Sequence, residues 1–129
     1  MNASPIVAQP QREQLNRFKN CRVYVAGHGG MVGSALIRAL APFEAQLVKR
    51  SSAELDLRNQ QATSQFFHDE RPEIVLFAAA RVGGIQANSA KPADFLYDNL
   101  VMATNAIRAA YEWGTSRFIY LGSTCIYPR

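Results

Sequence analysis

The sequence predicts an α/β protein built on a parallel sheet with helices on both faces. Short apolar segments alternate with helix-like segments along residues 22–121, which is typical of strands joined by helical crossovers. A glycine-rich turn follows the first apolar segment directly, and residues 73–77 are almost entirely apolar, as in a strand covered on both faces. We therefore expect a Rossmann-like, doubly wound sheet with strand order 3-2-1-4.

Apolar runs and helical spacing locate the individual elements. The expected strands are residues 22–26, 45–49, 73–77 and 117–121. The expected helices are residues 30–40, 59–70 and 92–113. Pro42 should stop the first helix and Gly114 should cap the last one, while residues 81–90 are expected to form a glycine-bearing loop.

Length and composition indicate one domain at most. The 129 residues are 48% hydrophobic, which is ample for a core. Residues 1–20 are polar, hold two prolines and lack the apolar stretch of a secretory signal. We expect them to be a mobile tail. Residues 21–129 then form the single domain.

Charge and cysteine content narrow the classes of function. The net charge of +4 comes from scattered arginines, which does not indicate nucleic-acid binding. No apolar run approaches the roughly 20 residues of a membrane span. Cys21 and Cys125 flank the first and last strands at opposite ends of a parallel sheet, too far apart for a disulfide. Two unpaired thiols suggest a cytoplasmic setting.

The turn after the first strand has the pattern of a pyrophosphate-binding loop. Gly27 permits a tight turn, Gly30 lets a phosphate approach the backbone, and Gly33 lets the helix pack closely on the strand. Amide groups at the helix start, around Met31 and Val32, would face the anion. The alternative is an ordinary glycine-rich turn between two elements.

The residues after the second strand bear on cofactor choice. An NAD site usually has a carboxylate there, which bonds the ribose 2′-hydroxyl. This chain has Arg50 followed by two serines, which favours the 2′-phosphate of NADP over NAD, unless Arg50 is merely exposed. Asp56, with Leu57 beside it, is placed to meet the adenine amino group, although Asp56 could equally be a helix cap.

Small residues follow the third strand. Ala78, Ala79 and Ala80 would let a cofactor lie across the sheet edge, or they are plain core. Asn99, on the long helix, is another expected cofactor contact, and its simpler explanation is a bond to the neighbouring loop.

Hydroxyl and thiol groups follow the fourth strand. The hydroxyl of Ser123 can polarise a carbonyl. Cys125 could transfer a proton if its pKa is lowered, although a lone cysteine is more often a small buried hydrophobe. His28 and His68 lack companions with metal-ligand spacing, so we expect no metal site and assign them no chemistry.

Four segments together resemble the GDP-L-fucose synthase family of extended short-chain dehydrogenase/reductases. They are Val-Ala-Gly-His-Gly-Gly-Met-Val-Gly-Ser (25–34), Leu-Phe-Ala-Ala-Ala-Arg-Val-Gly-Gly-Ile-Gln-Ala-Asn (76–88), Lys-Pro-Ala-Asp-Phe (91–95) and Tyr-Leu-Gly-Ser-Thr-Cys-Ile-Tyr-Pro (120–128). The resemblance covers residues 22–129. The Val-Gly-Gly-Ile and Cys-Ile-Tyr-Pro segments are not shared by nucleotide-sugar epimerases in general.

The resemblance implies an NADP-dependent enzyme, typically a homodimer, acting on GDP-4-keto-6-deoxy-D-mannose. Such enzymes epimerise C3 and C5 and then reduce C4 with hydride from NADPH. Ser123 matches the catalytic serine that bonds the 4-keto oxygen, and Cys125 matches the cysteine proposed as a base in epimerisation.

The chain departs from the family pattern in three respects. The family usually has arginine where Gly29 stands and often another basic residue near Ser52, and both help to hold the 2′-phosphate. The family's Tyr-x-x-x-Lys pair and its acid histidine are absent from these residues. The resemblance therefore implies that residues 21–129 are an incomplete NAD(P)-binding domain, the N-terminal part of such an enzyme, and we expect this part to be inactive alone. The alternatives are another NAD(P)-dependent nucleotide-sugar epimerase or dehydratase, or a non-catalytic dinucleotide-binding module.

Overall fold

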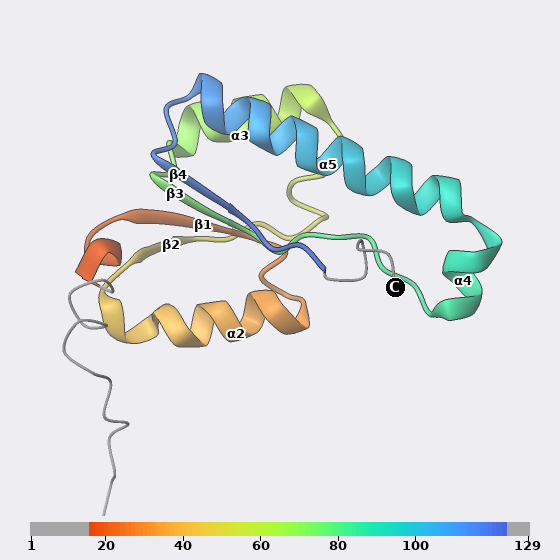
Figure 1. The fold of residues 1–129 in the computed structure, drawn as a ribbon. Coiled ribbons are helices and arrows are strands. Elements are labelled where there is room, and N and C mark those ends of the chain that lie inside the picture. Colours follow the sequence, from red (N-terminus) through yellow and green to blue (C-terminus); the bar gives the residue numbers. More distant parts are fainter. Residues whose placement is uncertain (1–15, 124–129) are drawn as a thin grey trace, which may run out of the picture.

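The computed structural model describes residues 16–123, which form a parallel sheet between two layers of helices (Figure 1). The strands are β1 Arg22–Ala26, β2 Gln46–Val48, β3 Ile74–Phe77 and β4 Arg117–Tyr120. The helices are α2 Met31–Leu40, α3 Gln60–Glu70, α4 Ile85–Ala90 and α5 Pro92–Glu112, with 3-10 turns η1 Asn16–Phe18 and η2 Ala41–Phe43. The predicted α/β class is confirmed.

The order of the strands differs from the expected one. The sheet runs β2-β1-β3-β4, with every pairing parallel, so the predicted order 3-2-1-4 is wrong. All four residues of β3 are buried, whereas β2 is a short strand with an exposed first residue. A strand that is buried along its whole length needs a neighbouring strand on each edge. β3 has these neighbours because it lies between β1 and β4. The apolar run 74–77 therefore marked an interior strand rather than an edge strand.

The chain reverses direction across the sheet between β1 and β3. From β1 it passes through α2 to β2 on one side, and from β2 it returns through α3 to β3 on the other side of β1. Because both crossovers are expected to be right-handed, the two helices must cover opposite faces. Figure 1 shows α2 on one face and α3 with α5 on the other. Ligands of doubly wound folds bind outside the carboxyl ends of the strands at such a reversal.

Each face of the sheet has its own core. Side chains alternate along β1, so that Tyr24 and Ala26 pack with α3 and α5, while Val23 and Val25 pack on the α2 side. Phe67, which is fully buried, anchors α3 to the first of these cores. The loop between β2 and α3 reaches the same core. The sheet is thus covered on both faces, which holds the carboxyl ends of β1 and β3 in fixed positions.

Two further segments differ from the sequence-based expectation. Residues 85–90, expected in a loop, form the short helix α4 before Pro92 starts α5. Phe18, within the expected tail, packs against the core on the α2 side, so packed structure extends at least to η1. Residues 1–15 of that tail lie outside the described residues. Within residues 16–123, no helix is sufficiently long and apolar to span a bilayer.

Candidate functional site: a pocket at the β1–β3 reversal

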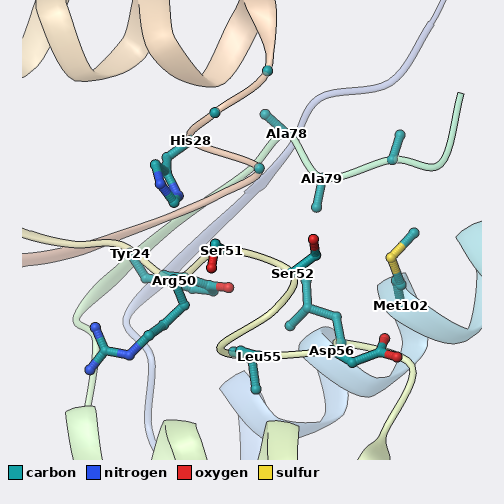
Figure 2. A pocket seen from close by; sticks show the side chains of 15 residues that line it. Tyr24, His28, Arg50, Ser51, Ser52, Leu55, Asp56, Ala78, Ala79 and Met102 are labelled. Atoms are coloured by element: carbon teal, nitrogen blue, oxygen red, sulfur yellow. The ribbon is translucent and has the colours of Figure 1, made fainter.

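A pocket of about 390 Å³ lies at the carboxyl ends of β1, β2 and β3. Its walls come from the turn after β1, the loop after β2, the three alanines after β3 and one side chain of α5 (Figure 2). The lining residues are Tyr24, Gly27, His28, Gly29, Gly30, Arg50, Ser51, Ser52, Leu55, Asp56, Leu57, Ala78, Ala79, Ala80 and Met102. Predicted residues from three separate segments are therefore brought together at one site.

Gly27 and Gly33 fix the shape of the turn after β1. Gly27 has φ +78°, and a Cβ there would lie 2.7 Å from the carbonyl oxygen of Ala78. A Cβ on Gly33 would lie 2.0 Å from the carbonyl oxygen of Gly27. Real Cβ atoms essentially never approach backbone this closely, so both positions require glycine. Gly33 does not line the pocket but brings α2 close enough for its first turn to face it.

The start of α2 lies beside this turn. Gly30 is the N-cap of α2 with no side-chain capping bond, and its own N–H donates to the Gly27 carbonyl at 3.0 Å. Gly30 lines the pocket, whereas Met31 and Val32 do not and have exposed side chains. Any contact from Met31 and Val32 would therefore come from backbone amides at the positive end of the helix dipole.

His28 contributes a feature that the sequence analysis did not anticipate. Its side chain lines the pocket, and its Nδ1 is buried with no hydrogen-bond partner among the described residues. Buried polar atoms normally have a partner, so this nitrogen is suited to a polar group of a bound ligand. The glycines that exclude a Cβ and this orphaned nitrogen both fit an occupied dinucleotide site.

The loop after β2 presents fewer free groups than expected. Arg50 is a lining residue of the pocket, but its guanidinium forms an ion pair with Glu70. The N–H and the hydroxyl of Ser51 both donate to the Glu54 carboxylate, each at 2.7 Å. The bond from the Ser51 N–H, followed by that from its hydroxyl, lowers the pKa of Glu54. Ser51 and Glu54 thus form a local capping box. Ser52 contributes the other hydroxyl group among the residues that line the pocket.

Asp56 lines the pocket but does not cap α3. The N-cap is Asn59, whose side-chain oxygen accepts from the N–H of Ala62 at 3.0 Å. Asp56 instead accepts from the Arg58 side chain at 2.8 and 3.0 Å, and these bonds lower the pKa of Asp56. Leu57 lines the pocket wall beside it. The alternative role of Asp56 as a helix cap is wrong, since the cap is Asn59. The adenine contact of Asp56 stays a prediction.

Ala78, Ala79 and Ala80 line the pocket as expected. Asn99 does not line it. The Asn99 side chain accepts from the N–H of Arg81 at 2.7 Å and donates to the Arg81 carbonyl at 2.9 Å. Asn99 therefore clamps the loop that follows the alanines, which was its simpler explanation. Ser123 is exposed and does not line the pocket, and Cys125 lies outside the described residues.

Tyr24 also lines the pocket, although its place in a buried strand gave no sign of this in the sequence. It belongs to β1, is 1% exposed and packs on Phe66 with ring centroids 4.6 Å apart. Burial raises the pKa of its hydroxyl well above the ordinary value, against a smaller opposing effect of the Arg50 charge. Tyr24 is therefore a neutral phenol at physiological pH. Met102 of α5, also unanticipated, closes the pocket beyond Asp56 (Figure 2).

The buried carboxylate of Asp98 on α5 is a further feature that the sequence analysis did not anticipate. Asp98 is 8% exposed and forms ion pairs with Arg81, from the loop after β3, and with Arg58, from the loop before α3, the latter at 3.3 Å. Asn105 adds bonds from its side-chain nitrogen to the carbonyls of Leu57 and Arg58. These contacts tie two walls of the pocket to α5. The hydrogen bond from Arg81 leads the effects that lower the pKa of Asp98.

We expect Asp98→Asn to destabilise the chain at neutral pH and to have a smaller effect at pH 2.5. A carboxylate whose pKa is lowered by folding stabilises the native state above its unfolded pKa of about 3.9, and this contribution disappears as pH falls through the folded pKa. The measurement is urea unfolding of both proteins at pH 7 and pH 2.5. An equal difference at the two pH values would contradict the assignment.

Comparisons with known proteins agree with this geometry. Residues 23–129 match the family described as the NAD dependent epimerase/dehydratase family. A GDP-L-fucose synthase of Sinorhizobium fredii is 46% identical over 108 residues, covering 84% of this chain and 34% of that relative. The chain thus spans about a third of the length of the curated relatives it matches.

Two solved structures of similar fold are described with NADPH or NADP. A GDP-D-glycero-L-gluco-heptose synthase from Campylobacter jejuni, crystallised in the presence of NADPH, is 39% identical with a TM-score of 0.80, over 84% of this chain and 32% of that one. A GDP-mannoheptose C4 reductase from the same organism, with NADP bound, is 39% identical with a TM-score of 0.73, over 77% and 32%. The family match over residues 23–129 is consistent with the glycine turn and the pocket at the β1–β3 reversal. This chain belongs to the NAD dependent epimerase/dehydratase family.

Proposed function

We propose that this chain binds NADP(H) in the pocket at the β1–β3 reversal. The observation that carries the proposal is the turn after β1, where Gly27 and Gly33 leave no room for a Cβ and the uncapped start of α2 adjoins the pocket. Such a turn supports pyrophosphate binding by backbone amides and the helix dipole. The buried Nδ1 of His28 adds an unused polar group at the same wall.

The reaction that we propose for the whole enzyme is the conversion of GDP-4-keto-6-deoxy-D-mannose to GDP-L-fucose. It comprises epimerisation at C3 and C5 and reduction at C4, for which bound NADPH supplies the hydride. The fucose synthase relative at 46% identity supports this substrate. In this proposal Ser123 bonds the 4-keto oxygen and Cys125 acts as a base in epimerisation.

A second candidate is reduction of a different GDP-linked keto sugar. The two Campylobacter jejuni relatives, both 39% identical, are named for GDP-heptose chemistry. A GDP-sugar is common to both candidates, and the choice of sugar depends on residues that bind it. The fucose assignment is supported by similarity to the synthase relative.

We also propose that the enzyme is a cytoplasmic homodimer. The support for an interface is the outer surface of α5, where large apolar side chains stay in contact with solvent. They are Leu96, Tyr97, Leu100, Ile107 and Tyr111, which are 50–83% exposed. Exposed apolar surface of this kind is typical of interaction sites.

The test is a calorimetric titration of the 129-residue chain with NADPH, followed by an assay with GDP-4-keto-6-deoxy-D-mannose. We expect saturable binding with one site per chain and no oxidation of NADPH. The sequence has no Tyr-x-x-x-Lys pair, and positioned acid–base groups of that kind contribute about 10²–10⁴ in rate. Absence of binding at millimolar NADPH would contradict the proposed cofactor, and turnover would contradict the proposed inactivity.

A further inference from the structure

We propose that Glu70 restricts the preference of this pocket for NADPH by holding Arg50 away from it. This inference rests on the proposed NADP(H) site and concerns only the choice between the two dinucleotides. Arg50 is the one lysine or arginine among the lining residues, and it follows β2, where the ribose 2′ position is read in this class of fold. Its orientation therefore decides how strongly the pocket attracts a 2′-phosphate.

Three contacts hold the Arg50 side chain, and none of them involves Ser52, near which we expect the 2′-phosphate. Its Nη2 pairs with the Glu70 carboxylate, and its Nη1 donates to the carbonyl of Lys49 at 2.8 Å. The guanidinium carbon lies 5.7 Å from the centre of the Phe66 ring. Figure 2 shows the guanidinium directed away from Ser52 and Met102. A 2′-phosphate near Ser52 must therefore draw Arg50 out of this arrangement.

Glu70 is held in place independently of Arg50. It is the last residue of α3, and its backbone carbonyl accepts from Nη1 of Arg22 at 2.6 Å. Arg22 begins β1, so this bond fixes the end of α3 to the sheet. This bond fixes the backbone of Glu70, so its carboxylate can move only by rotation of its own side chain. A negative charge at a helix C-terminus also opposes the helix dipole, which gives Glu70 a reason to retain a cationic partner.

The other groups of the wall do not replace Arg50. Ser51 donates both its N–H and its hydroxyl to the Glu54 carboxylate, so both donors are already engaged. Gly29 adds no side chain. The pocket thus has a cation at the position that favours NADPH, but that cation is already neutralised by Glu70.

The test is titration of NADPH and NADH into the wild-type chain and Glu70→Gln. Ion pairs in contact with solvent contribute about 0.2–1 kcal/mol, so releasing Arg50 should raise NADPH affinity about 1.4- to fivefold and leave NADH affinity unchanged. Asp69→Asn is the matched control, because it removes a charge from the same helix end without touching Arg50. It should leave both affinities unchanged.

A second background separates release of Arg50 from a general change in charge. In Arg50→Met, the change Glu70→Gln should no longer alter the affinity for NADPH. Equal gains for both dinucleotides, an unchanged NADPH affinity in a folded Glu70→Gln chain, or a gain that persists without Arg50 would each overturn the inference. If wild type binds NADPH and these results fail, only the role of Glu70 is wrong. If wild type binds neither dinucleotide, the proposed function itself is wrong.

Discussion

Gly33→Ala is expected to weaken NADPH binding by about 100-fold. The new methyl carbon would lie 2.0 Å from the Gly27 carbonyl oxygen and 2.7 Å from the Cα of His28. Both are main-chain atoms of the turn, so no side chain can rotate away, and α2 must move by about 1 Å or more to restore an ordinary contact. Overpacking of this kind typically costs about 1–3 kcal/mol of stability.

The same displacement moves the first turn of α2 away from the pyrophosphate. Losing two charge-assisted hydrogen bonds at roughly 1.5 kcal/mol each weakens binding by about 100-fold. Calorimetric titration of the folded variant measures this loss. Gly29→Ala is the matched control, since a Cβ at Gly29 has nothing within 4 Å and its φ is not positive. Wild-type affinity in Gly33→Ala would show that the turn does not bind the cofactor.

Gly29→Arg is expected to strengthen NADPH binding and to leave NADH binding nearly unchanged. Gly29 lines the pocket, and its Cβ position is open, so a long side chain can be added without displacing the backbone. An arginine there offers the 2′-phosphate a cation that has no carboxylate partner already, unlike Arg50. A charge-assisted bond of roughly 1.5–3 kcal/mol corresponds to a gain of about 10- to 150-fold.

The design of this experiment separates charge from bulk. Gly29→Gln introduces a side chain that is long and polar but uncharged, and it should give much less than the gain of Gly29→Arg. The affinities of all three chains for both dinucleotides are measured at one ionic strength, because exposed charges are screened by salt. If Gly29→Arg improved NADH as much as NADPH, the 2′-phosphate would not lie near Gly29.

Local patterns predicted most of the fold. Helical spacing and Pro42 located α2, which ends at Leu40 as expected, and apolar runs located all four strands within one or two residues. Strand order was predicted wrongly because adjacent elements along a chain do not specify which side of β1 the third strand joins. The residues themselves distinguish an interior strand from an edge strand. Residues 74–77 are apolar on both faces, as in an interior strand, whereas Gln46 of the edge strand β2 is polar and exposed.

The site was predictable where backbone geometry demands a residue type, as at Gly27 and Gly33. It was not predictable where long side chains choose among partners. Arg50 selects Glu70, which is twenty positions away in sequence, and Asp98 joins Arg58 and Arg81 from two different loops. A sequence pattern contains no sign of these pairs, because they form only when tertiary contacts bring the loops together.

The most direct test of the NADP(H) site is a map of NADPH-induced chemical-shift changes in the amide spectrum of the 129-residue chain. The largest changes should fall in residues 27–33, 50–57 and 78–80, which form or adjoin the walls of the pocket. A second hollow, between α3 and α5, is lined by Gln61, Ser64, Gln65, His68 and Trp113. Changes concentrated there, or no saturable changes at all, would contradict a dinucleotide site at the β1–β3 reversal.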